Sequence, residues 1–599
     1  MKTQIQELES LFEEAQKDSF EGDHDNALRR FNQILQIVPN HPYVLRAAAI
    51  SSFHLCRIDQ GIEYLSRALR SDPNQPGIYC DLGVALLFKK ENTQALFCFD
   101  RAIELDPTFY DAFINKSSLL HDIKRFEDSI AVSQKAVAIR PNSHLAYINL
   151  ARSYNEIGKF QESVDVCDIA LVLHPSSLDA CLCQTIALAK MGKMTEAKEV
   201  CAKILASDPH HKEARLHLGN CLLQEEKFSQ ALDQYHHVLF IDPDYVAGLS
   251  NRGFCYLQQL DLDNAVKDFE KALSLQPDFM DAQWNLSLAL LTKGDFKRGW
   301  KLYESRFQTK KAPATIRHLD IPWLGTLEVN KKKVFIHIEQ GYGDVIQFCR
   351  YLPLLADLGA KVTIEVPNEL QKLICSIDSR VNVVLPNTPI GSQDRQVPLL
   401  TLPYLFDTEE FSIPSKTPYL WIKKALKKTK ASDRIQIGFA FSGEVKNPLN
   451  LRRRIPLNLW KNLLECPFEF HCLHKEITTE EKEFLQSYPS VHIHQEAIKD
   501  FTDTAALILE MDLIITVDTS IAHLTGALGK PVWILLSHTP DFRWMLHRKD
   551  SPWYPTAELI RQEAMGDWNG VMQTVEKKLK SSFLTKGRGK NAASKRRVG

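Results

Sequence analysis

The 599-residue sequence has no long hydrophobic run and no excess of charge of one sign. No apolar stretch approaches the roughly 20 residues needed to cross a bilayer. The start, MKTQIQELESLFEEAQ, is amphipathic and acidic and lacks the apolar core of a secretion signal. Lysine plus arginine (73) nearly balance aspartate plus glutamate (74), so the whole molecule has no strong field for nucleic acid or an acidic membrane. These absences predict a cytoplasmic protein with no transmembrane segment and no nucleic-acid partner.

Paired cysteines and several catalytic motifs are also missing. The 13 cysteines are scattered without a CxxC pair, and only Cys181 and Cys183 lie close together, so we expect reduced thiols packed as small hydrophobic side chains. There is no Walker sequence GxxxxGK[ST], no third glycine of a dinucleotide fingerprint, and no HExxH or Ser-His-Asp arrangement in its usual context. ATP hydrolysis and hydride transfer are therefore disfavoured.

Proline recurs every 34 residues through the first half of the chain, the period of tetratricopeptide repeats. The prolines in this register are Pro39, Pro73, Pro107, Pro141, Pro175, Pro209, Pro243 and Pro277. Small residues and aromatic residues keep the same register: Gly83, Gly219 and Gly253; Ala27, Ala95, Ala197, Ala231 and Ala265; Phe31, Phe99, Tyr235 and Phe269. The repeat therefore involves packing positions as well as the proline.

The segment DLGVALLFKKENTQALFCFDRAIELDPTF shows one complete unit, a helix, a polar turn and a second helix that ends before Pro107. Small residues let the two helices approach, an aromatic ring wedges between them, and stacking supplies the core that one pair lacks. We predict an α solenoid over residues 1–313, with eight repeats and a partial ninth that acts as a cap. Gly299 stands at the alanine position of this ninth unit, and no ninth proline follows.

The solenoid has two functional interpretations. Its concave surface can hold an extended peptide or a partner protein, or the repeats only space or dimerise the molecule. The repeated residues are structural and do not identify a ligand. The residues after the solenoid therefore have to indicate the chemistry.

From Val334 onward, short β-branched runs alternate with helix-length segments. The runs are VFIHIE, KVTIEV and VNVVLP, then IQIGFAF, FEFHCLH, VHIHQ, DLIITVD and PVWILL. This alternation predicts parallel sheets with right-handed crossovers. After a linker at 314–330 we expect two Rossmann-like lobes, 331–425 and 433–575, separated by a polar, lysine-rich segment. Residues 580–599 carry seven basic residues and no acid, which is typical of a flexible tail.

Two stretches carry candidate site residues. In QGYGDVIQF, Gly341 and Gly343 are free to adopt backbone angles closed to other residues, and Asp344 follows the carboxyl end of a strand. In DLIITVDTSIAHLTGALGKPVWILL, a strand ends at Asp518 where a helix begins. The hydroxyls of Thr519 and Ser520 and the free N–H groups there can hold a phosphate, with His523 in the first turn. A simple helix cap and a structural histidine are the alternative interpretations.

Five motifs in order resemble the glycosyltransferase family 9 module, a heptosyltransferase-like domain often found behind bacterial tetratricopeptide repeats. They are HIEQGYGDVIQFCRYLPLL, IGFAFSGEVKNPLNLRRRIPL, DFTDTAALILEMDLIITVDTSIAHLTGALGKPVWILL, DFRWMLHRKDSPWYP and GDWNGV, within about residues 295–575. The resemblance implies a GT-B fold of two facing lobes, with the donor on the second and the acceptor near the first. It also implies inversion at the anomeric carbon without a metal or other cofactor.

The same resemblance implies roles for single residues. Asp344 would be the general base, and Asp518 would hold sugar hydroxyls. Thr519, Ser520 and His523 would lie at the donor diphosphate. Arg453 and Lys475 occupy basic positions of the family and would offset the charge of the leaving group.

The chain departs from the family pattern at two places. Relatives commonly read Gly-Asn-Pro-x-His where this chain has Gly443-Glu444-Val445-Lys446-Asn447, and Leu-Gln-Lys is replaced by Leu473-His474-Lys475. Glu444 places negative charge beside the expected diphosphate unless Lys446, Arg452, Arg453 or Arg454 compensates it.

The prediction is therefore an inverting, metal-independent glycosyltransferase that uses a nucleotide sugar. Its acceptor, a protein or a saccharide, is presented by the solenoid, whose groove holds a protein partner. The layout also resembles O-linked N-acetylglucosamine transferases, in which repeats precede a GT-B domain. Two alternatives stay open: a non-catalytic scaffold with a degenerate transferase module, and a transferase acting on a lipid-linked saccharide. The altered 443–447 loop favours the scaffold, and the retained Asp344 favours the enzyme.

Overall fold

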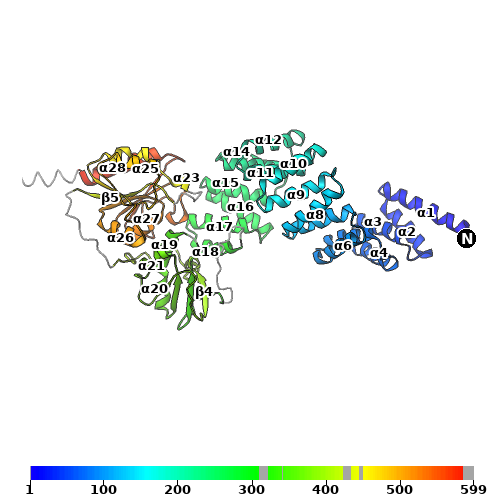
Figure 1. The fold of residues 1–599 in the computed structure, drawn as a ribbon, viewed down its shortest axis with the longest axis horizontal. Coiled ribbons are helices and arrows are strands. Elements are labelled where there is room, and N and C mark those ends of the chain that lie inside the picture. The colour runs from blue at the N-terminus through cyan, green and yellow to red at the C-terminus, as the bar shows by residue number, and fades with distance from the viewer. Residues whose placement is uncertain (1, 309–320, 340, 423–433, 444–449, 585–599) are drawn as a thin grey trace, which may run out of the picture. The chain divides into compact units, whose positions relative to one another are not determined.

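The computed structural model describes residues 2–308, 321–339, 341–422, 434–443 and 450–584 (Figure 1). The chain forms two compact units, Met1–Pro243 and Asp244–Gly599. Within the described ranges, no helix combines the length and the apolar character required to traverse a membrane.

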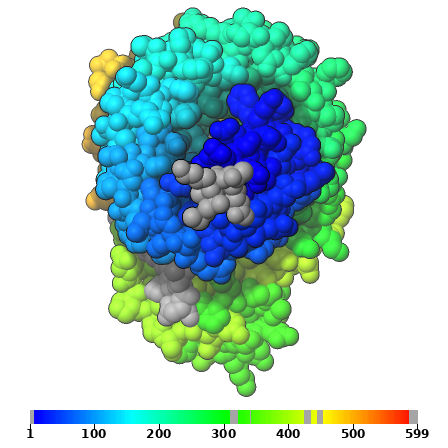
Figure 2. Space-filling view, turned by 90° about the vertical axis from the view of Figure 1, so that its right-hand side faces the viewer, coloured from blue at the N-terminus to red at the C-terminus, as the bar shows by residue number. Residues whose placement is uncertain are grey.

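The first unit is a series of paired antiparallel helices. They are α1 (Lys2–Phe20), α2 (His24–Ile37), α3 (Pro42–His54), α4 (Ile58–Ser71), α5 (Pro76–Phe88), α6 (Asn92–Leu105), α7 (Tyr110–Asp122), α8 (Phe126–Ile139), α9 (His144–Glu156), α10 (Phe160–Leu173), α11 (Leu178–Lys190), α12 (Met194–Ser207), α13 (Lys212–Gln224) and α14 (Phe228–Ile241). Figure 2 looks onto the first helices of this unit, in blue, with the following repeats in cyan curving away from them. This region is the helical solenoid that the sequence predicts.

Glycines on the first helix of a repeat face an aromatic ring on the second. A Cβ atom added at Gly83 would lie 2.5 Å from the ring of Phe99, and one added at Gly219 would lie 2.6 Å from the ring of Tyr235. Both rings are fully buried. The absence of a side chain at these positions therefore allows the aromatic wedge, as the repeat register predicts.

The turns inside the repeats share a left-handed residue that the sequence analysis did not identify. Positive φ values recur every 34 residues, at Gly22, Cys56, Lys90, Lys124, Gly158, Gly192, Glu226, Leu260 and Gly294. The first helix of each pair ends one or two residues before this position, where the chain reverses. Only some repeats use glycine, so the motif is visible in the backbone and not in the sequence.

The second unit begins with four more repeat helices and continues into two sheets. The helices are α15 (Val246–Gln258), α16 (Leu262–Leu275), α17 (Met280–Lys293) and α18 (Phe296–Tyr303), followed by the 3-10 turn η1 (Glu304–Phe307). All thirteen cysteines of the two units are free thiols, and most are buried. That outcome matches the expectation of reduced, packed cysteines.

The first lobe holds a four-stranded parallel sheet of order β3-β2-β1-β4. Its strands are β1 (Lys333–His337), β2 (Lys361–Glu365), β3 (Asn382–Val384) and β4 (Arg395–Pro398). Its helices and 3-10 turns are α19 (Tyr342–Phe348), η2 (Cys349–Tyr351), α20 (Leu352–Asp357), α21 (Asn368–Ile374), η3 (Leu399–Thr401), α22 (Leu402–Leu405) and η4 (Glu410–Ser412). In register, Val334 of β1 lies between Val362 of β2 and Arg395 of β4. The sequence prediction missed β4.

The second lobe holds a six-stranded parallel sheet of order β10-β9-β8-β5-β6-β7, which is a doubly wound Rossmann order. Its strands are β5 (Gln436–Ala440), β6 (Glu469–Cys472), β7 (Val491–Ile493), β8 (Leu513–Val517), β9 (Val532–Leu536) and β10 (Ala557–Arg561), the last also missed. Its helices and turns are α23 (Asn450–Arg453), η5 (Leu457–Trp460), α24 (Lys461–Leu464), α25 (Thr479–Gln486), α26 (Phe501–Glu510), α27 (Ser520–Ala527), η6 (Phe542–Trp544), α28 (Trp568–Leu579) and the π-helical turn η7 (Lys580–Leu584). Figure 1 shows α25 and α28 on one side of this sheet and α26 and α27 on the other.

The partial ninth repeat is part of the core that joins the two lobes. Trp300 of α18 is almost fully buried, and its ring meets those of Phe348 and Phe542 edge-on, with centroids 6.1 and 5.6 Å away. The described part of the predicted linker, 321–330, also belongs to this packing, because Leu324 lies in the same core and donates its N–H to the Gln396 carbonyl of β4. The last repeats and the lobes therefore fold as one unit.

Candidate functional site

The GYGD motif lies where β1 passes into α19. Gly341 caps the helix with φ −69° and ψ 173°, which any residue can adopt, and Gly343 also has no positive φ. The expectation of special backbone angles is therefore wrong for both. A Cβ added at Gly343 would lie 2.9 Å from the ring of His523, whereas one at Gly341 would meet nothing within 4 Å. Gly343 thus serves the close approach of α27 to α19.

The second predicted cluster lies at the end of β8. Asp518 follows the strand and is buried, and the hydroxyl of Thr519 caps α27 by accepting the N–H of Ile521 at 3.3 Å. Ser520 is the first residue of the helix. The helix-cap interpretation is therefore correct for Thr519, and the N-terminus of α27 opens at the carboxyl edge of the sheet.

The two clusters occupy the switch points of their sheets. In the first lobe, strand order reverses between β1 and β4, and in the second between β5 and β8, and such crevices are where open α/β sheets bind ligands. Asp344 follows β1, and Asp518 follows β8. The two carboxylates are close enough for Asp518 to raise the pKa of Asp344. Motifs from separate lobes thus meet at one site.

Arg543 joins the lobes at this point. Its Nη2 donates to Oδ1 of Asp344, and its Nη1 lies 2.7 Å from Oδ1 of Asp541. Burial raises the pKa of Asp344, and the Arg543 guanidinium opposes that rise. Burial also favours a higher pKa for Asp541, but the charge and hydrogen bonds of Arg543 outweigh burial there, so the pKa of Asp541 is lowered. The two carboxyls on one guanidinium are therefore electrostatically different.

Arg453 is the cation beside Asp518. Its Nε lies 3.7 Å from Oδ2 of Asp518, and its Nη1 donates to the Asp518 carbonyl at 3.3 Å. Burial raises the pKa of Asp518, and Arg453 opposes it. The neighbouring Arg452 instead donates to Gln258 of α15, and Arg454 to Glu481. Arg453 thus contacts the predicted donor side.

His523 is buried against aromatic side chains. Its Nδ1 lies 3.0 Å from the hydroxyl of Tyr554, and its ring stacks on Trp544 at 5.2 Å. Burial, with the positive charge of Arg543, lowers the pKa of His523 to about 3. The imidazole is therefore neutral at physiological pH and acts at the site as a hydrogen-bonding group and not as a cation.

The departures from the family pattern have different outcomes. Gly443 follows β5, while the remainder of the altered loop, 444–447, lies outside the described residues. His474 is buried, and its Nε2 accepts the N–H of Phe441 at 3.0 Å, so it supports the chain just before Gly443. Lys475 is exposed, and its ammonium donates to the Lys499 carbonyl at 3.3 Å. Lys475 thus lies at the carboxyl edge of the sheet but does not join the Asp344 and Asp518 cluster.

Sequence reasoning did not single out several charged residues around the site. Besides Asp541 and Arg543, Glu339 after β1 forms a buried pair with Arg306 of η1, with Nε to Oε2 at 2.6 Å. Arg350 is also buried and donates to the carbonyls of Trp553 and Pro414. The motif DFRW contains Arg543, but its partner lies 199 positions earlier, and no local pattern indicates that pairing.

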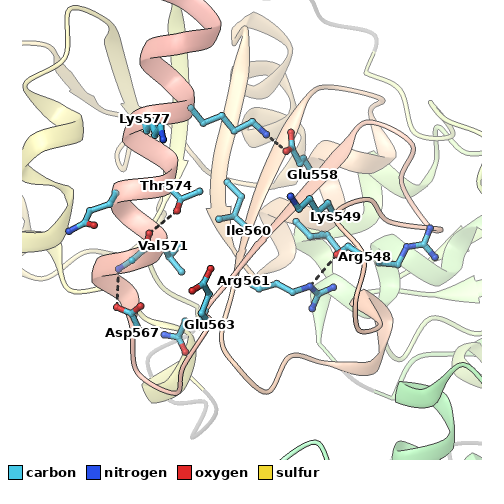
Figure 3. Close-up of a pocket in the computed structure, with 15 residues that line it drawn as sticks. Arg548, Lys549, Glu558, Ile560, Arg561, Glu563, Asp567, Val571, Thr574 and Lys577 are labelled. Carbon is cyan, nitrogen blue, oxygen red and sulfur yellow. Dashed lines mark hydrogen bonds and ion pairs between the residues drawn. The ribbon is translucent and has the colours of Figure 1, made fainter.

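A separate cavity of about 790 Å³ lies between β10 and α28, outside the predicted site. Figure 3 shows Arg561 and Ile560 on the strand and Thr574 and Lys577 on the helix. Lys549 lies next to the strand, where its carbonyl accepts the N–H of Leu559. Its lining mixes both signs of charge, and Lys578 pairs with Glu558 within it. In the portions of the chain that the structure describes, no group of three or more His, Cys, Asp or Glu side chains is arranged to hold a metal ion.

Family comparisons agree with this architecture. Tetratricopeptide repeat families match residues 21–79, 76–109, 110–143, 188–252 and 246–279. Glycosyltransferase family 9 (heptosyltransferase) matches residues 498–580, which include β8, α27 and η6. The chain therefore carries tetratricopeptide repeats and a C-terminal glycosyltransferase family 9 domain, as the sequence predicted.

One curated relative is Protein FlbA of Caulobacter vibrioides, 28% identical over 329 residues that cover 49% of this chain and 54% of that protein. The chain thus spans about half the length of this relative. Among solved structures, a tetratricopeptide repeat protein from Parabacteroides merdae is 17% identical, with a TM-score of 0.39, covering 42% of this chain and 98% of that one. YrrB, titled a TPR protein with an unusual peptide-binding site, is 26% identical with a TM-score of 0.24, covering 31% and 95%. These structural scores are too low to add to the argument.

Proposed function

We propose that the protein is an inverting, metal-independent glycosyltransferase that moves a sugar from a nucleotide-sugar donor to an acceptor held by the repeat solenoid. One observation carries the proposal. Asp344 and Asp518, predicted from motifs 174 positions apart in the sequence, lie at the switch points of the two lobes, and Asp518 is close enough to raise the pKa of Asp344. That arrangement suits a base on the first lobe and a donor site on the second.

In this proposal Asp344 is the general base. Its carboxylate takes the proton of the acceptor hydroxyl while that oxygen attacks the anomeric carbon, and the bond to the nucleoside diphosphate breaks on the opposite face. The configuration is inverted in the one displacement. Burial raises the pKa of Asp344, which makes it a stronger base than an exposed aspartate. We expect the acid limb of the kcat/KM profile to lie above the ordinary aspartate pKa of about 3.9.

The donor is assigned to the second lobe. Asp518 accepts hydrogen bonds from sugar hydroxyls, and the N-terminus of α27, with Thr519, Ser520 and neutral His523, lies at the diphosphate. Arg453 offsets the charge that develops on the leaving group, which supports a mechanism without a metal or another cofactor. Lys475 remains a proposed donor contact from the neighbouring strand end.

The acceptor, a protein or a saccharide, is assigned to the solenoid side. The support comes from contacts inside the second unit. Gln258 of α15 accepts a hydrogen bond from Arg452 at 2.7 Å, and its carbonyl accepts one from the hydroxyl of Thr539 at 3.3 Å. Arg452 lies in the segment that carries Arg453, and Thr539 lies in the segment that carries Arg543. A repeat helix thus adjoins the loops of the proposed site.

The test is release of nucleotide from UDP-, GDP-, ADP- and CMP-linked sugars by the purified protein, with cell lysate as a source of acceptor. We expect turnover of one donor, and a loss of about 10²–10⁴-fold in the Asp344→Asn variant, the usual contribution of a general base. Asp357→Asn is the matched control, because that carboxylate is exposed on the same lobe and pairs with Arg380. If no donor is turned over and none binds, the result would support the scaffold alternative instead.

A further inference from the structure

Arg543 holds two carboxylates with one guanidinium. Nη2 donates to Oδ1 of Asp344, and Nη1 and the backbone N–H of Arg543 both donate to Oδ1 of Asp541, at 2.7 and 3.0 Å. The Arg543 side chain is 7% exposed, that of Asp344 17% and that of Asp541 23%. An arginine held twice by one carboxylate is oriented by it and presents its other edge to the second.

Aromatic packing fixes the same guanidinium. Its central carbon lies 4.6 Å from the ring centroid of Phe542 and 5.4 Å from that of Phe348, which belongs to the same helix as Asp344. Trp300 packs against both rings. The orientation of Arg543 therefore depends on buried rings as well as on Asp541.

The two oxygens of Asp344 differ in their surroundings. Oδ1 accepts from Arg543, whereas none of the described residues donates a hydrogen bond to Oδ2. The side chain is not fully buried. One oxygen is therefore engaged, and the other is left to meet a substrate.

We propose that Arg543 is a positioning residue for sugar transfer. It keeps Asp344 ionised through Oδ1 and directs Oδ2 toward the acceptor hydroxyl, and Asp541 holds Arg543 in that orientation. This inference rests on the proposed function, since it concerns the same base. Arg543 itself takes no proton and forms no bond to the substrate in this role.

The charges that face Asp344 predict opposite effects for two substitutions. The first lobe contributes Glu339, and the second contributes Asp518, Asp541 and Arg543, with Arg453 beyond Asp518. His523 packs against Gly343 and is neutral. Removing Arg543 leaves burial and three carboxylates, which raise the pKa of Asp344. Removing the charge of Asp541 takes away a repulsion between carboxylates and so lowers the pKa of Asp344, provided that Arg543 stays in place.

The first test is the pH dependence of kcat/KM for the donor that the wild type turns over. We expect Arg543→Gln to move the acid limb upward by about one pH unit or more, and Asp541→Asn to move it downward. The effect should fall on kcat more than on KM for the donor, because the base does not bind the donor. Arg548→Gln is the control, since Arg548 follows in the same segment and pairs with Glu410 and Asp550. An unshifted acid limb in both variants would overturn the proposal.

The second test needs no turnover and so separates this inference from the proposed function. In an Asp344→Cys variant, the thiol reports the local field through the pH dependence of its alkylation by iodoacetamide, read by mass spectrometry of that peptide. Adding Arg543→Gln should raise the thiol pKa by about one unit or more, and adding Asp541→Asn should lower it. Equal pKa values in all three proteins would sink the idea, whatever the donor panel shows.

Folding needs its own control, because Arg543→Gln leaves the half-buried carboxylates of Asp344 and Asp541 without their guanidinium. Arg543→Lys keeps a positive charge but cannot hold both carboxylates in the same geometry. We expect it to preserve the thiol pKa more closely than Arg543→Gln does. If Arg543→Gln does not fold, the comparison of Arg543→Lys with Asp541→Asn decides, and shifts in the same direction for these two would contradict the proposal.

Discussion

Two ion pairs, one from the first unit and one from the second, differ in their exposure to solvent. Arg57 and Asp25 link neighbouring repeats at 3.0 Å, with side chains that are 49% and 54% exposed. Arg306 and Glu339 lie 2.6 Å apart, with side chains that are 3% and 1% exposed. An exposed pair contributes little because water competes for it, whereas a buried charge without its partner is costly. The difference between these two pairs predicts that removing one partner is costly at Arg306 and Glu339 and has little effect at Arg57 and Asp25.

The largest expected effect tests the buried side of this comparison. Arg306→Ala leaves Glu339 buried without its guanidinium, and we expect the second unit to lose about 3–5 kcal/mol of unfolding free energy. Urea denaturation of the full chain, followed by fluorescence and far-UV circular dichroism, measures it. The double variant Arg306→Met/Glu339→Gln should regain more than half of the loss, because the buried carboxylate of Glu339 is removed together with its cation. Glu304, the other acidic partner of Arg306, is 30% exposed and stays accessible to water. If Arg306→Ala alone lowers the free energy of unfolding by less than 1 kcal/mol, the expected cost of the buried charge is wrong.

The next effect concerns a buried histidine and depends on pH. Burial lowers the pKa of His474 to about 4 from its ordinary 6.5. Between these two pH values the unfolded chain binds a proton at this histidine and the folded chain does not. The contribution of neutral His474 to the free energy of unfolding is therefore fully present above pH 6.5 and is lost as the pH falls toward 4. His474→Gln keeps an acceptor for the Phe441 N–H, which is bonded to His474 in the wild type. We expect little change at pH 7.5 and a gain of about 2 kcal/mol over the wild type at pH 5.

Chemical denaturation at the two pH values measures this difference. His492→Gln is a suitable control, because that histidine is exposed on β7 and pairs with Glu469 at the surface. The two variants should behave alike at pH 7.5. An equal response of both at pH 5 would show that burial of His474 is not the cause.

A smaller effect is expected from the left-handed turns of the repeats. Gly158 has φ 79° with nothing near its missing Cβ, so Gly158→Ala should cost about 1 kcal/mol from backbone strain alone. Lys124 occupies the same position one repeat earlier with φ 64°, and Lys124→Gly should stabilise the first unit or leave it unchanged. Thermal unfolding of both variants gives the comparison. A stabilising Gly158→Ala would refute the shared turn.

The smallest effect tests the exposed side. Arg57→Gln should change the unfolding free energy of the first unit by less than about 1 kcal/mol, and the change should shrink further in high salt. Denaturation at low and high ionic strength measures both. A loss as large as that of Arg306→Ala would remove the distinction between the two regions.

The solenoid was predictable because its signal repeats. Eight prolines at a fixed spacing identify the unit, and Gly83 beside Phe99 shows the packing that the register implies. The strands were predictable where they are apolar and β-branched. RQVP of β4 and AELIR of β10 are short and partly polar, so hydrophobic pattern alone does not distinguish them from loops.

The candidate site was predictable in its motifs and not in its contacts. Asp344 and Asp518 each follow a recognisable strand, so their place at a carboxyl edge can be read locally. The contact of Arg543 with Asp344 joins residues 199 positions apart, and it depends on how two lobes face each other. The exposed position of Lys475 and the support from His474 likewise follow from tertiary packing, which a single sequence does not encode in its local pattern.

The burial of Trp300 in the core between the lobes bears on how the protein can change in evolution. A solenoid needs a terminal unit that seals its last apolar face. Here the two lobes seal that face, and α18 shares one core with both of them. Repeats can therefore be gained or lost toward the N-terminal end without exposing the sealed face, whereas a change in α17 or α18 would reach the residues that hold Arg543. Variation in repeat number and preservation of the Arg543 contacts thus fall at opposite ends of one array.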